Sequence, residues 1–183
     1  MTEKIFVGQL CLIACCLFYL AWWNAAYYPG ADGNTLNGSK GVWFWLTAAT
    51  ALIGIWQNAQ GIHNLPEVEA FSVRRICLVG AMLYFVLAVV TYGIFRRPLT
   101  AELALIVAWC GLETATLQAL WANGSLTSEK LYFLAAVVLL ATVIGLIAYI
   151  EYYKLSETKA FYCGMIPLAV DAAAMGIVCY SIS

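Results

Sequence analysis

The sequence predicts an all-α fold, a polytopic integral membrane protein built as a six-transmembrane-helix bundle. Hydrophobic residues make up 64% of the 183 residues and charged residues only 10%. A typical soluble domain has about 25% charged residues. Six apolar segments each approach the roughly 20 residues that a membrane-spanning helix needs. The breaks between these segments are rich in turn-forming or charged residues, so each break is interpreted as a loop.

The six predicted helices form a single domain over residues 1–183, and they cover residues 5–28, 41–61, 75–95, 101–121, 131–153 and 160–181. The first segment is longer than the roughly 7–15-residue core of a signal peptide and is not followed by a small-residue cleavage pattern. We therefore expect it to be retained as a helix. The loop PGADGNTLNGSKG follows it, and the charged loop HNLPEVEAFSVRR follows the second helix.

The remaining breaks carry helix-boundary signals. The short run RRPL places Pro98 near the start of the fourth helix, a position that proline favours. Thr127 or Ser128 would cap the fifth helix, and Ser156 or Thr158 would cap the sixth. With six spans, the second, fourth and sixth helices would all enter the membrane from the same side.

Charge and metal-ligand content exclude several classes of function. The net charge is −1, so nothing indicates a nucleic-acid partner. The 7 cysteines all lie in apolar segments without a CxxC motif and are interpreted as free, buried thiols. His63 is the only histidine, which excludes a two-histidine haem site and a multi-histidine zinc site. No pattern indicates a particular cofactor, so the cofactor stays unknown.

Two acidic residues lie deep inside predicted helices. Glu113 is about 18 Å and Asp171 about 16 Å from the start of its helix, at 1.5 Å per residue, so both would lie near the middle of a bilayer. A charged group there costs at least about 2.5–3.5 kcal/mol. All lysines and arginines lie at helix ends or in loops. The two acids must therefore be protonated, bonded to each other, solvated in a cavity, or matched by a bound cation.

Polar and aromatic residues at matching depth extend this candidate site. Thr47, Thr50, Gly54 and Gln57 recur at helical spacing and share one face of the second helix. The predicted solute- or ion-binding residues are Glu113, Asp171, Gln57, Thr50, Thr116, Trp109 and Trp56. The aromatic residues near the helix ends instead predict a belt at the membrane interface. The alternative is that threonine and glutamine join helices, and that the two acids form a neutral pair that stabilises the bundle.

Three functions fit this pattern. The first is a small-solute membrane transporter or channel with a midplane acidic site, coupled to protons or cations. The second is a membrane-embedded enzyme that acts on a lipid or other apolar substrate through its carboxyl pair, so enzymatic activity stays open. The third is a substrate-binding or structural subunit of a larger membrane complex. The expected partners are the lipid bilayer, a small solute or cation, and a second copy or another membrane protein.

Overall fold

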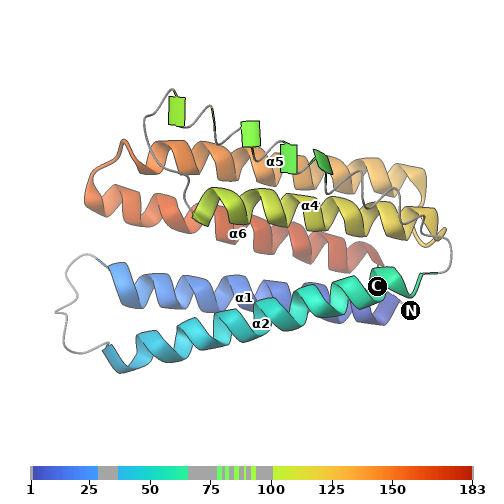
Figure 1. Ribbon diagram of the computed structural model, residues 1–183, viewed down its shortest axis with the longest axis horizontal. Coiled ribbons are helices and arrows are strands. Elements are labelled where there is room, and N and C mark those ends of the chain that lie inside the picture. Colours follow the sequence, from blue (N-terminus) through green and yellow to red (C-terminus); the bar gives the residue numbers. More distant parts are fainter. Residues whose placement is uncertain are drawn as a thin grey trace.

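The computed structural model is all-helical. It describes residues 2–28, 37–65, 78, 79, 81, 82, 85, 86, 89, 92, 93 and 101–182. The helices are α1 (Thr2–Tyr27), α2 (Asn37–His63), α4 (Ala101–Ala122), α5 (Ser128–Tyr152) and α6 (Glu157–Ile182) (Figure 1). The all-α prediction is confirmed, and five of the predicted helical segments are present with ends that shift by at most a few residues.

The predicted number of six spanning helices is not supported. Among the described residues, 4 helices are long and apolar enough to cross a membrane, namely α1, α4, α5 and α6. Helix α2 is long enough, with 27 residues, but Thr47, Thr50, Gln57 and Asn58 lower its hydropathy. The predicted helix over residues 75–95 falls largely outside the described residues. The four apolar helices are consistent with a membrane protein.

The helices form two groups that meet along α1. Helices α1 and α2 run antiparallel and make the most extensive contact (Figure 1). Helix α5 packs against both α4 and α6. Helix α1 also packs against α6, whereas α2 barely touches α4. Both termini lie at the same end of the bundle, and α2, α4 and α6 all start at the opposite end (Figure 1). The common direction of these three helices agrees with the prediction.

Glycines let α1 and α2 approach closely. A Cβ on Gly8 would lie 2.8 Å from the backbone nitrogen of Asn58, and one on Gly54 would lie 2.9 Å from the Leu12 side chain. A Cβ on Gly61 would lie 3.0 Å from the backbone nitrogen of Ile5. These distances leave no room for a methyl group, so α1 and α2 lie this close together only because these three residues are glycines.

A hydrophobic cluster fills the end of the bundle that carries the termini. Its buried members are Ile5, Leu65, Leu117, Ala119, Leu120, Leu126, Leu134, Val138 and Val178. They come from α1, α4, α5, α6 and the segments that follow α2 and α4. Thr127 is the N-cap of α5, and its hydroxyl accepts a hydrogen bond from the backbone N–H of Lys130 at 3.4 Å. This confirms one of the two predicted caps of that helix.

Aromatic side chains gather at the opposite end of the bundle. The Trp23 indole nitrogen of α1 donates to the backbone oxygen of Phe161 in α6 at 3.1 Å. The same indole packs against Gly164, where a Cβ would lie 2.7 Å from the ring. Ring contacts then link Trp23 to Tyr27 and to Tyr152 of α5. These contacts tie α1 to the start of α6 and the end of α5, and the predicted belt at a membrane interface stays a prediction.

Replacing Gly8 by alanine should destabilise the protein by about 1–3 kcal/mol, because the added methyl overpacks a contact that cannot expand without moving a backbone. Thermal unfolding of the detergent-purified protein would measure the change. Gly176→Ala is the matched control, because nothing lies within 4 Å of a Cβ at that helical position. Equal melting temperatures for the two variants would contradict the close packing of α1 on α2.

Candidate functional site

A glutamine and a glutamate form a buried pair between α1 and α4. The Gln9 Nε2 donates to both carboxyl oxygens of Glu113, at 2.9 Å to Oε1 and 3.1 Å to Oε2. Both side chains are fully buried. The amide supplies hydrogen bonds but no positive charge, and the ion pair found among the described residues is the exposed Lys154–Glu151 pair. The carboxyl of Glu113 is therefore hydrogen-bonded to an amide and has no cationic partner among the described residues.

Gln9 was not among the residues predicted from the sequence. The prediction considered only the three helices that start at the same end, and α1 starts at the other. The signal was present, because Gln9 is a single amide inside a long apolar stretch of α1. Such a group in an apolar helix needs a partner, and a buried carboxyl at similar depth is a suitable one.

Asp171 lies in α6 in a different setting. It is 8% exposed, lines a cavity, and forms no hydrogen bond or ion pair with any described residue. Its carboxyl lies near enough to Glu113 for the two charges to interact. No hydrogen bond joins Asp171 to Glu113 among the described residues, so they are two acids in separate surroundings. Pro167, one turn earlier in α6, also lines the cavity.

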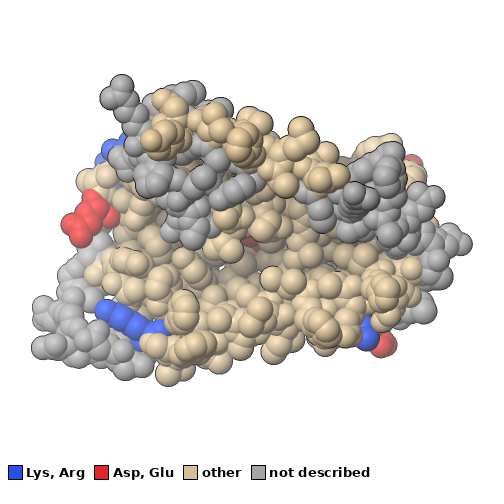
Figure 2. Space-filling view, in the orientation of Figure 1, with Lys and Arg blue, Asp and Glu red and all other residues tan. Residues whose placement is uncertain are grey.

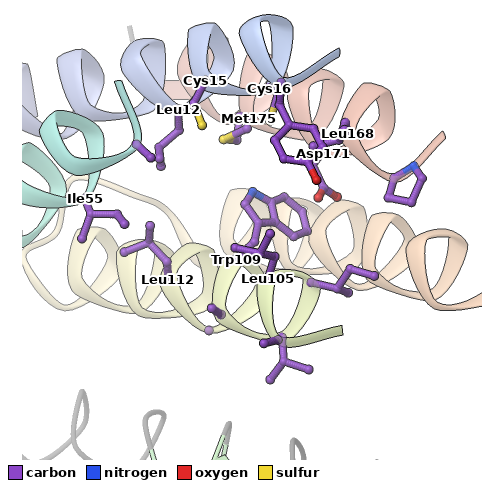
Figure 3. Close-up of a pocket in the computed structure, with 18 of the residues that line it drawn as sticks. Leu12, Cys15, Cys16, Ile55, Leu105, Trp109, Leu112, Leu168, Asp171 and Met175 are labelled. Atoms are coloured by element: carbon purple, nitrogen blue, oxygen red, sulfur yellow. The ribbon is translucent and has the colours of Figure 1, made fainter. Parts of the chain in front are cut away.

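The cavity has a volume of about 1150 Å³, and its described lining comes from α1, α2, α4, α5 and α6, with Leu65 and Ala81 in addition. This exceeds the roughly 300–1,000 Å³ of typical ligand pockets. Most of the lining is apolar, and the residues nearest Asp171 in Figure 3 include Cys16, Trp109, Leu168 and Met175. Figure 2 shows a hollow between α2 and α4, with acidic atoms visible inside it. The cavity thus joins a large apolar volume to one carboxyl.

An aromatic ring faces the same space as the acid. Figure 3 shows Asp171 reaching into the cavity from α6 and Trp109 reaching toward it from α4. Trp109 packs against a cluster that contains Leu12, Cys16 and Met175. Its buried Nε1 has no hydrogen-bond partner among the described residues. An occupant of the cavity would therefore meet a carboxyl and an indole ring together.

The cavity lining holds few other polar groups. Thr47, His63 and four tyrosines contribute to it, and no lysine or arginine is found among its described lining residues. The described residues also contain no group of three histidine, cysteine, aspartate or glutamate side chains that could hold a metal ion. The arrangement suits one carboxylate-mediated contact inside an otherwise apolar volume.

Several predicted residues lie away from the cavity. Thr116 is buried, and its hydroxyl donates to the Leu112 backbone oxygen at 2.8 Å. The Thr50 hydroxyl donates to the Leu46 backbone oxygen at 2.7 Å. Gln57 is half-buried, and Trp56 is 63% exposed on the outer side of α2.

The orientation of α2 explains these positions. Gly54 and Gly61 pack one face of α2 against α1. The polar residues that share this face near Gly54 therefore face α1. Of the seven predicted residues, the structure brings Asp171 and Trp109 to the cavity. Glu113 does not line the cavity and is hydrogen-bonded to Gln9.

Comparisons with known proteins add no family. No protein-family model matches the chain, and neither a curated protein nor a solved structure gives a significant match. The geometry of the cavity and of the two acids is therefore the basis for proposing a function.

A double-mutant cycle on Gln9 and Glu113 tests the buried pair. Gln9→Leu should lower the free energy of unfolding by about 1.5–3 kcal/mol, because it leaves a buried carboxyl without its donor. Gln9→Leu combined with Glu113→Leu should cost less than the two single changes added together, because no polar group is then left unpaired. Thermal or denaturant unfolding of the purified protein measures all four forms.

Gln57→Leu is the control for this cycle, because Gln57 forms no hydrogen bond with another described residue. It should change stability by less than about 1 kcal/mol. If the two single changes and the double change were additive, the Gln9–Glu113 contact would contribute nothing to stability.

Proposed function

We propose that this protein is an integral membrane carrier for a small solute, with Asp171 as the acid that contacts the solute. The observation that carries this proposal is the state of Asp171, a buried carboxyl on a large cavity with no partner among the described residues. Buried carboxyls are costly without a partner. The simplest reason for an unpartnered carboxyl at this position is a functional role rather than a contribution to stability.

The surface of the bundle supports a membrane location. Large apolar side chains are exposed on several helices, including Trp45 at 71%, Leu52 at 70% and Tyr132 at 74%. Soluble monomers rarely expose contiguous apolar patches of more than a few hundred square ångströms. Lipid chains would cover these side chains, while the carboxyls of Glu113 and Asp171 face the interior of the bundle.

The lining favours a carrier over an open channel. A conducting pore needs polar groups along its length. Here the polar lining residues are Asp171, Thr47, four tyrosines and, at the end of α2, His63, and the rest of the described wall is apolar. Beyond Glu113, the hydrophobic cluster that includes Leu117, Leu120 and Val178 fills the end of the bundle that carries the termini.

Glu113 would couple solute binding to a proton or cation. Its carboxyl interacts electrostatically with Asp171, and such interactions are strong where water is excluded. A proton or cation taken up at one acid lowers the negative potential at the other, so the two occupancies depend on each other. Gln9 would hold the Glu113 side chain in place while its charge changes.

Reconstitution into liposomes tests the proposal. A pH-sensitive dye inside the vesicles would report proton movement when amines, amides, ureas, vitamins or inorganic cations are added outside. At least one solute should give a response that depends on the protein, and Asp171→Asn should reduce it at least tenfold by removing the charge from the binding site. Glu113→Gln should uncouple solute movement, followed by radiolabel, from the pH change.

Glu151→Gln is the matched control, because Glu151 is an acid at the end of a helix, paired with Lys154 at 2.8 Å, and is not itself among the described lining residues. It should leave solute movement unchanged. A flux that Asp171→Asn does not alter would contradict the proposal. Conversion of an added lipid without any flux would instead favour the membrane-enzyme hypothesis.

A further inference from the structure

We infer that the solute is a hydrophobic organic cation, an apolar or aromatic body that carries one positive charge. This inference rests on the proposed function and names the substrate class of the same cavity. It is argued from three properties of the described lining: its charge, its scarcity of oxygen ligands and its aromatic content.

The charge of the lining selects for a cation. Asp171 is an unpartnered carboxyl on the wall, and the described lining offers no lysine or arginine. Glu113 adds a second acid close enough to interact with it. An anionic solute would meet repulsion from both acids at short range in an apolar setting. A cation would pair with the carboxylate and offset part of the cost of its burial.

The scarcity of oxygen ligands argues against a small inorganic cation. Calcium takes 6–8 oxygen ligands, and magnesium requires near-octahedral geometry with several retained waters. Around Asp171 the wall is instead formed by Cys16, Leu168 and Met175, and the described residues hold no group of three acidic, histidine or cysteine ligands. A weakly hydrated cation, whose charge is spread over an organic body, needs no such shell.

The volume and the aromatic wall suit the body of such a molecule. The cavity of about 1150 Å³ can accommodate several rings, and its apolar side chains favour removing those rings from water. Trp109 reaches toward the same space as the Asp171 carboxyl (Figure 3). Tryptophan is the aromatic side chain that attracts cations most strongly through its ring face. A cation bound between the two would contact the carboxylate on one side and the indole on the other.

Binding of three aromatic probes of different charge tests the inference. The probes are radiolabelled tetraphenylphosphonium as the cation, tetraphenylborate as its anionic counterpart of the same shape, and triphenylphosphine oxide as a neutral compound. The full-length protein in lipid nanodiscs would be compared with empty nanodiscs, to subtract partition into lipid. We expect saturable, one-to-one binding of tetraphenylphosphonium, at least tenfold tighter than that of either other probe.

Variants then locate the site. Asp171→Asn should weaken tetraphenylphosphonium binding at least tenfold, while Asp171→Glu should retain most of it because the charge is kept. Trp109→Leu should weaken binding several-fold, and Trp109→Phe should weaken it less. Glu151→Gln should have no effect. If Asp171→Asn does not fold, the comparison of Trp109→Leu with Trp109→Phe still tests the site.

The outcomes separate this inference from the proposed function. Equal binding of the cationic and neutral probes, together with flux of some solute in liposomes, would overturn the cation inference and leave the carrier intact. Tetraphenylphosphonium binding that neither Asp171→Asn nor Trp109→Leu weakens would place the site elsewhere and overturn the inference. An absence of saturable binding by all three probes would also overturn it. If no solute moved in liposomes either, the carrier proposal would fail as well.

Discussion

The structure depends on how it accommodates two carboxyl groups inside an apolar bundle. Helix α4 contains no lysine or arginine, and the only one in α6 is Lys159 in its first turn, so neither acid can be neutralised where it stands by a basic residue of its own helix. Glu113 meets this constraint with two hydrogen bonds from Gln9. Asp171 meets it with a cavity. Hydrogen bonds from Gln9 therefore hold one acid in place, while the other faces the cavity where we propose that the solute binds.

The cavity follows from unequal packing between the helices. Gly8, Gly54 and Gly61 draw α2 tightly onto α1, while α2 barely contacts α4. The two groups of helices meet mainly through α1 and α6, where the Trp23 indole bonds to Phe161. Among the described helices, the cavity lies beside α2 and α4, and Asp171 lines it from α6.

The sequence was sufficient for some of these features and insufficient for others. Apolar length and loop composition predicted five helices closely, and the direction of α2, α4 and α6 placed Glu113 and Asp171 at similar depth. Helical spacing correctly grouped Thr50 with Gly54, but spacing alone does not say which neighbour a face meets. That choice depended on the fit of Gly54 against Leu12, a contact between distant segments. The partner of Glu113 was also missed, because Gln9 lies on a distant helix that runs in the opposite direction.

The contact between α1 and α6 also has a consequence for the order in which the protein can be completed during synthesis. Helix α1 is made well before α6, yet α1 packs directly on α6. The α1–α2 hairpin can form early, and Glu113 can meet Gln9 once α4 has been made. Asp171, however, enters later, with α6. A nascent chain therefore holds the hydrogen-bonded acid before the cavity acid, and the wall that Asp171 forms is completed only after α6 has been made.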